Sequence, residues 1–197
     1  MNNKKTIIVT VSVILMGAVA RLLPHPANVT PLTAIALLGG SYLSPALALT
    51  VPLAALFASD LFLGFHGTMP FVYASFILVS ALGLFLKSRR NAQTIALACV
   101  TSSLLFFVVT NFGVWATSSL YPHSGSGLLA CYTAALPFLR NSALGDLFFT
   151  AALFSLETSA LKLIPSAGAS ISFEFGIIAA GWANQVGYQN ERTSRVV

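Results

Sequence analysis

Two aspartates and two arginines stand where charged side chains are costly, within or beside long apolar runs of this sequence. Asp60 and Asp146 fall inside apolar segments, and Arg21 and Arg140 fall at the ends of such segments. A carboxylate in hydrocarbon costs about 3 kcal/mol or more unless it is paired or faces a polar cavity. We therefore consider two arrangements, which can coexist. Two buried Asp–Arg pairs would tie helix ends together, and a ligand site would use some of the same residues.

Other side chains that can bind a small molecule fall near the same ends of the apolar runs. Together with Asp60, Arg140 and Asp146 they make one set of ligand-binding candidates: Asn28, Asp60, His66, Tyr73, Asn111, Trp115, His123, Arg140 and Asp146. Two alternatives stay open for members of this set. Trp115 and Tyr121 could instead be belt residues that anchor the protein at the membrane interface. Asn28 and Thr30 could instead cap the helix that follows them.

All three histidines, His25, His66 and His123, fall in predicted loops between apolar runs. If the loops converge, the imidazoles could hold a transition metal, or one of them could ligate the metal of a corrinoid-type cofactor. Alternatively, they are solvated or hydrogen-bond to backbone and shape the loops. We favour the second interpretation, so no metal site is predicted and the cofactor is unknown.

Motifs of common catalytic sites are missing from the sequence. It has no GxSxG, no HExxH, no two carboxylates three or four residues apart, and no GxxxxGK[ST] loop for phosphate. The chain therefore does not hydrolyse ATP through such a loop. Ligand binding is expected rather than catalysis, and the alternative is an integral membrane enzyme or an assembly factor without a transport function.

Composition identifies the class of protein that must position these residues. Only 8% of the 197 residues are charged and the mean hydropathy is +0.85, whereas soluble domains carry about 25% charged residues. We predict an all-α membrane protein embedded in a lipid bilayer. The net charge of +5 does not indicate nucleic-acid binding, because the bases do not cluster into a stripe.

The apolar runs predict a bundle of six transmembrane helices. We place the spans at 6–23, 30–43, 44–63, 69–86, 94–116 and 141–164. Thr30-Pro31 and Ser44-Pro45 indicate helix starts, since serine and threonine cap helices and proline suits the first turn. The apolar stretch 128–139 is too short to span and is expected to be interfacial or re-entrant. Residues 1–164 thus form one domain, and 165–197 a cytoplasmic or interfacial tail in which 171–186 is an alternative seventh span.

Three stretches of the sequence resemble a known family. They are RLLPHPANVTPLTAIALLGG at 21–40, SDLFLGFH at 59–66 and NFGVW at 111–115. They resemble an uncharacterised bacterial family of small integral membrane proteins. That family is similar to the substrate-binding S components of energy-coupling-factor (ECF) transporters. The shared layout covers residues 6–164 and includes a proline-led second span that ends in Gly-Gly.

The resemblance implies a protein of the bacterial inner membrane that captures a small molecule. S components bind a vitamin or metal from outside with their first, third and fifth loops, and they rely on a separate transmembrane coupling subunit and ATPases for energy. We therefore expect an S-component-like binder for uptake of a small cofactor, vitamin or precursor. Many S components dock their partner through an alanine-x-x-x-alanine face, where this sequence has a patch of small residues, Gly17, Ala18 and Ala20.

Lysine and arginine counts predict that both termini are cytoplasmic, because cytoplasmic loops carry an excess of these residues. In the six-span arrangement, Arg21 and Arg140 lie outside. The other eight bases lie inside: Lys4, Lys5, Lys87, Arg89, Arg90, Lys162, Arg192 and Arg195.

Reporter fusions test this orientation. Fusions at residue 90 and at the C-terminus should report a cytoplasmic location, and a fusion at Ser124 a periplasmic one. If the C-terminal fusion alone reported the periplasm, segment 171–186 would span the membrane and the six-helix arrangement would be wrong.

Overall fold

The computed structural model describes the backbone of residues 3–163 and the side chains of residues 10–156, and this part is helical without strands. The predicted tail at 165–197, with its alternative span, lies outside it. The helices are α1 (Asn3–Leu22), α2 (Leu32–Tyr42), α3 (Pro45–Leu63), α4 (Met69–Phe85), the 3₁₀ helix η1 (Leu86–Ser88), α5 (Ala92–Thr117) and α6 (Gly125–Leu163). The all-α prediction is confirmed for these residues.

Two of the helix starts show how local sequence sets the boundaries. Ser44 caps α3, its hydroxyl accepting a hydrogen bond from the Leu47 amide at 3.5 Å, and Pro45 is the first helical residue. This start is confirmed. The start predicted for the second helix is wrong by one position. Pro31 itself is the N-cap of α2, without a side-chain cap, so Thr30 does not cap the helix.

The largest departure from the sequence prediction is α6, a single helix of 39 residues. We expected a separate short segment at 128–139 and a span from residue 141. The polar residues Arg140 and Asn141 suggested a break, but polar side chains do not end a helix. Arg140 is exposed, and Pro137 lies inside the helix without ending it. At about 1.5 Å per residue, α6 is about 58 Å long, longer than the ~30 Å hydrocarbon core.

Three helical segments are long and apolar enough to cross a membrane: Pro45–Leu63, Met69–Ser88 and Ala92–Thr117. The chain thus has the helices of a membrane protein. By contrast, α2 has 11 residues and a length of about 16 Å, which is half of a hydrocarbon core.

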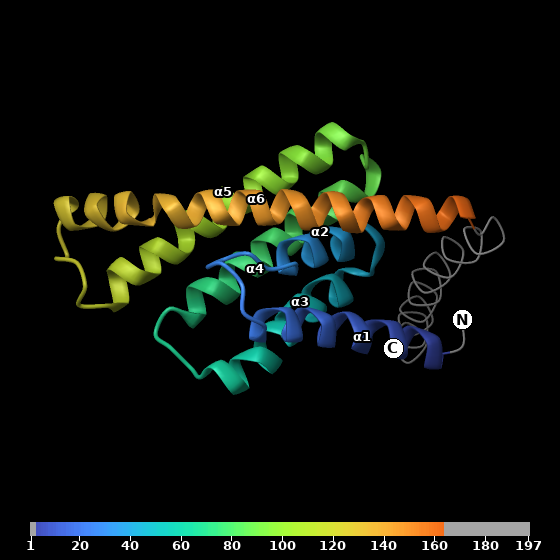
Figure 1. The fold of residues 1–197 in the computed structure, drawn as a ribbon, viewed down its shortest axis with the longest axis horizontal. Coiled ribbons are helices and arrows are strands. Elements are labelled where there is room, and N and C mark those ends of the chain that lie inside the picture. The colour runs from blue at the N-terminus through green and yellow to red at the C-terminus, as the bar shows by residue number, and fades with distance from the viewer. Residues whose placement is uncertain (1–2, 164–197) are drawn as a thin grey trace, which may run out of the picture.

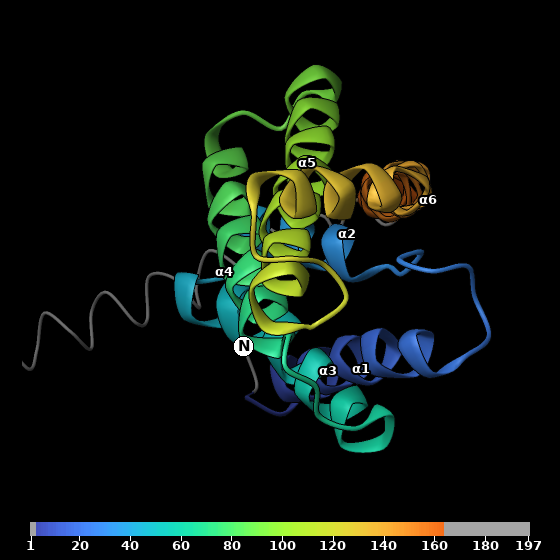
Figure 2. The same ribbon diagram turned by 90° about the vertical axis from the view of Figure 1, so that its left-hand side faces the viewer.

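The short helix α2 lies at the centre of the bundle. It contacts α1, α3, α4, α5 and α6, and in both views it lies between α6 and α1 (Figures 1 and 2). Leu32, Ile35 and Leu37 from this helix are buried, together with the alanines between them. Figure 1 shows α6 running along the whole length of the molecule on one side of α2.

Glycines allow α2 to approach α4 with backbone against backbone. A Cβ atom on Gly40 would lie 2.5 Å from the carbonyl carbon of Gly83, which is too close for van der Waals contact. Gly17 of α1 is also enclosed, with Ala55, Leu32 and Ile35 at 3.1–3.2 Å from where its Cβ would stand. Gly17 and its buried neighbour Ala18 therefore pack within the bundle.

The α2–α4 contact predicts a contrast between two neighbouring glycines. Gly40→Ala should destabilise the protein by about 1–3 kcal/mol, the usual cost of overpacking, and should lower the midpoint of thermal unfolding in detergent. Gly39→Ala is the matched control, because its Cβ would meet only Leu43 Cδ1 at 3.5 Å and both changes alter helix propensity equally. An equal effect of the two substitutions would contradict the close approach.

Candidate functional site

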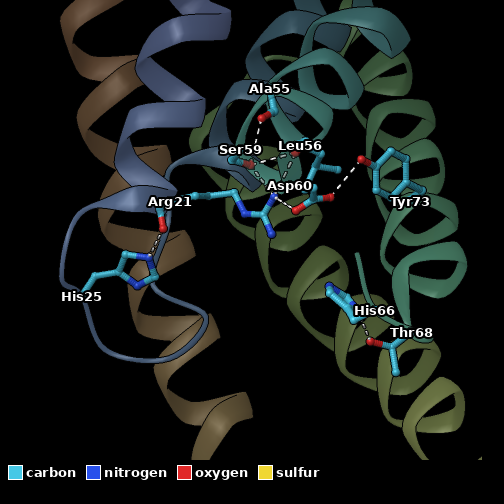
Figure 3. Close-up of polar contacts among 9 residues, drawn as sticks. All are labelled: Arg21, His25, Ala55, Leu56, Ser59, Asp60, His66, Thr68 and Tyr73. Carbon is cyan, nitrogen blue, oxygen red and sulfur yellow. Dashed lines mark hydrogen bonds and ion pairs between the residues drawn. The ribbon is translucent and has the colours of Figure 1, made fainter. Parts of the chain in front are cut away.

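An ion pair joins three helices at one end of the bundle. The Arg21 Nη1 atom donates to Asp60 Oδ1 at 2.7 Å, and also to Ser59 Oγ at 2.6 Å. The Tyr73 hydroxyl donates to the other carboxylate oxygen, Oδ2, at 2.9 Å. Arg21 reaches Asp60 from α1 and Tyr73 reaches it from α4 on the opposite side (Figure 3). One Asp–Arg pair of the kind considered from the sequence is therefore present, with side chains only 16% and 2% exposed.

Asp146 joins a different set of three helices. The Ser103 hydroxyl of α5 donates to Asp146 Oδ2 at 2.7 Å, and the Thr33 side chain of α2 lies near the same carboxylate. The residue is 3% exposed. A second Asp–Arg pair, the other half of the arrangement considered from the sequence, does not form among the described side chains, and Arg140 is exposed on α6. Among the described side chains, Arg21–Asp60 is the sole ion pair.

A cavity of about 420 Å³, here called the polar cavity, lies between these two aspartate clusters. It draws residues from all six helices and from two loops. Its lining consists of Arg21, His25, Asn28, Thr30, Leu32, Thr33, Leu56, Leu63, His66, Val72, Phe76, Phe106, Ser142 and Asp146.

The shortness of α2 explains why a cavity can exist here. Leu32 and Thr33 are the first two residues of this helix, and both line the cavity. On the N-terminal side of these two residues α2 does not continue through the centre of the bundle. The α1–α2 loop passes around the side of the bundle instead (Figure 2). Asn28 in that loop has φ 64°, a left-handed conformation that asparagine adopts more readily than most residues. The loop after α3 turns at Gly64, with φ 88°.

The histidines are held by local contacts. The His25 ring lies 2.8 Å from the Pro26 carbonyl oxygen and 3.3 Å from that of Arg21, and His66 Nδ1 lies 2.8 Å from Thr68 Oγ1 (Figure 3). His123 packs edge-on against Trp115, with ring centroids 5.5 Å apart. Within the described residues, no group of three or more His, Cys, Asp or Glu could hold a metal ion. The contacts of His25 with backbone carbonyl oxygens fit the loop-shaping interpretation, whereas His66 and His123 contact side chains.

The structure divides the nine predicted ligand-binding residues into three groups. Asn28, His66 and Asp146 line the polar cavity. Asp60 and Tyr73 lie behind Arg21 and hold it in place. The remaining four stand elsewhere on α5, α6 and their connection: Asn111, Trp115, His123 and Arg140.

The residues in this last group have structural contacts of their own. Asn111 Nδ2 donates to the Phe107 carbonyl oxygen within its own helix at 2.8 Å. Trp115 Nε1 donates to the Pro122 carbonyl oxygen at 3.0 Å and so braces the α5–α6 loop. That loop lies at the N-terminal end of α6, on the left of Figure 1.

Several cavity residues were missing from the predicted set. Thr33 and Ser142 were not singled out, although Ser142 precedes Asp146 by four residues and so shares its helix face. Phe76 and Phe106 were also missed, because nothing in an apolar run marks which aromatic side chain faces a cavity.

A second cavity, of about 500 Å³, lies between α5 and α6. It is larger than the polar cavity but lies toward the start of α5, where it is lined by Arg90, Cys99 and mostly apolar side chains such as Ile95 and Phe154. Its lining includes no aspartate, whereas Asp146 lines the polar cavity. The polar cavity is therefore the candidate site.

A family model matches residues 1–167, which is most of the chain. The chain belongs to DUF6580, a family of unknown function. No curated protein matches it, and no solved structure does either.

The Arg21–Asp60 pair predicts a coupling between two substitutions. Asp60→Asn should leave the guanidinium without its counter-charge and cost about 2–3 kcal/mol. That is less than the cost of about 3–5 kcal/mol for breaking a fully buried pair, since Arg21 is partly exposed. Tyr73→Phe removes one hydrogen bond and should cost about 1 kcal/mol. Thermal unfolding in detergent measures both effects.

The double variant measures the interaction between the two charged side chains apart from their contacts with other residues. Arg21→Met combined with Asp60→Asn should cost less than the sum of the two single changes, because neither charge is left alone. Strict additivity would show that the two side chains do not depend on one another.

Proposed function

We propose that this protein binds a small molecule in the polar cavity and serves its uptake across the bacterial inner membrane. The ligand class is a cofactor, a vitamin or a precursor of one. The predicted orientation, with cytoplasmic termini, would open the cavity to the outer side. In this proposal the six helical segments lie in the bilayer in the S-component-like manner, with the 11-residue α2 extending through only part of its thickness.

The polar cavity is the observation that carries the proposal. Its volume of about 420 Å³ falls within the range of small-molecule sites, about 300–1,000 Å³. Apolar side chains, among them Phe76 and Phe106, line it together with polar side chains that converge from several helices and two loops. Such a mixture is typical of a site that binds and orients a ligand.

Energy for uptake would come from partners. The sequence has no phosphate-binding loop, so the proposal includes a separate transmembrane coupling subunit and ATPases. The small residues Gly17 and Ala18 pack inward, so they would not form the docking face. The exposed apolar side of α1, with Val11, Leu15 and Val19, is the better candidate for that contact.

The alternative is an integral membrane enzyme, and one contact favours it. Thr68 Oγ1 and His66 Nδ1 lie 2.8 Å apart, as a nucleophile and its base would. Thr68 does not line the polar cavity, however, and among the described residues no acid is hydrogen-bonded to His66 to orient its ring. Binding is therefore the better account of the cavity.

Native mass spectrometry of the purified protein tests the proposal. A small molecule should co-purify with the wild-type chain. Val72→Phe should abolish its retention, because Val72 lines the cavity and the larger ring would fill it. Ile77→Phe is the matched control, a β-branched residue changed in the same way on an exposed face of the same helix.

The control should keep the molecule at the wild-type level. Retention in the Val72→Phe variant, with both variants folded by size-exclusion chromatography, would contradict binding in this cavity.

A further inference from the structure

We propose that the ligand of the polar cavity is a small organic cation, an amine or ammonium compound, held by the carboxylate of Asp146. This inference rests on the proposed binding function and specifies its ligand class. It follows from the fixed charges around the cavity, from the aromatic rings beside them and from the different surroundings of the two aspartates.

The two aspartates differ in how their charge is balanced. Asp60 has Arg21 at 2.7 Å, so the two charges of this pair balance each other, and of the two residues Arg21 lines the cavity. Asp146 is almost as deeply buried, yet among the described side chains no Lys, Arg or His nitrogen lies within 4.0 Å of its oxygens. Buried charges in proteins are normally paired. A cation in the cavity would supply the missing partner.

The polar side chains beside Asp146 do not remove this requirement. The Ser103 hydroxyl is neutral, and it also lies 3.2 Å from the Cys99 carbonyl oxygen. Thr33 is neutral too. It stands in the first turn of α2, where the helix dipole supplies a partial positive charge of about half a unit. That partial charge favours the ionised carboxylate but leaves part of its charge uncompensated.

Aromatic rings in the same cavity suit a cation as well. Phe76 and Phe106 both line it, and their rings pack edge to face with centroids 5.7 Å apart. The faces of aromatic rings carry negative charge and attract ammonium groups. The neutral polar groups of Asn28, Thr30 and Ser142 remain to bind the rest of the ligand through hydrogen bonds.

Three probes of the same size but different charge test the inference: benzylamine, benzyl alcohol and benzoate. Binding to the full chain in detergent is measured by the shift of the thermal unfolding midpoint over a range of concentrations. In the wild type, benzylamine should stabilise the protein at concentrations at least about tenfold lower than benzyl alcohol, because only the amine pairs with the carboxylate. Benzoate should bind most weakly.

Two variants on α6 assign the effect to the charge. Asp146→Asn keeps the shape and hydrogen-bonding capacity of the side chain but removes its charge, so it should abolish the preference for benzylamine. Ser142→Ala removes a neutral polar group from the same wall and should preserve that preference. If the asparagine variant failed to fold, the comparison of probes on the wild type would still decide the question.

The outcomes separate this inference from the proposed function. Equal binding of benzylamine and benzyl alcohol, or stronger binding of benzoate, would overturn the cationic ligand. If Val72→Phe still abolished binding of the preferred probe, the binding function would stand. Failure of all three probes to bind would overturn the inference, and retention of a co-purified molecule would then test the binding function independently.

Discussion

The bundle is organised by the need to satisfy two carboxylates inside an apolar protein. Each aspartate is almost fully buried, and each has neighbouring polar side chains from two other helices. Asp60 connects α3 to α1 through Arg21 and to α4 through Tyr73, while Asp146 connects α6 to α5 through Ser103 and to α2 through Thr33. Leaving either group unpartnered would cost several kcal/mol. The relative positions of the helix ends are therefore constrained, and the polar cavity lies between the two clusters.

The short central helix α2 leaves room for the cavity between the two aspartate clusters. Its 11 residues pack closely against α4 through Gly40 and Gly83 and fill about half the thickness of a hydrocarbon core. The other half of the bundle centre holds the cavity. Serines placed among the helices do not disturb this packing, because hydroxyls such as those of Ser75 and Ser102 bond to carbonyl oxygens of their own helix.

Much of the fold could be predicted from the sequence. Composition indicates an all-α membrane protein, and Ser44-Pro45 marks the start of α3 because capping is a local property. The continuity of α6 could not be predicted from hydropathy, since a helix passes through Arg140 and Asn141 without a break when those side chains face outward. The Thr30-Pro31 pair resembled a cap plus first turn, but the helix begins one residue later.

The site was predictable only where charge is costly. Asp60 and Asp146 stand out because a carboxylate in an apolar run requires a partner, and two Asp–Arg pairs were considered without assigning the partners. Only Arg21–Asp60 forms among the described side chains. Arg140 lies six residues before Asp146 on the same helix and therefore points in another direction. Which phenylalanines face the cavity depends on helix rotation, which the uniform apolar runs do not encode.

The account depends most on the polar cavity being open to the outer side of the membrane, and cysteine labelling in intact cells tests this directly. Thr30→Cys places a thiol in the polar cavity, and Ala96→Cys places one in the second cavity. Both variants are made in a Cys99→Ala chain, because Cys99 also lines the second cavity, and this parent chain, with Cys131 buried, gives the background. A membrane-impermeant thiol reagent should label the Thr30→Cys variant in intact cells and the Ala96→Cys variant only after permeabilisation. Labelling of Thr30→Cys only after permeabilisation would contradict capture of a ligand from outside.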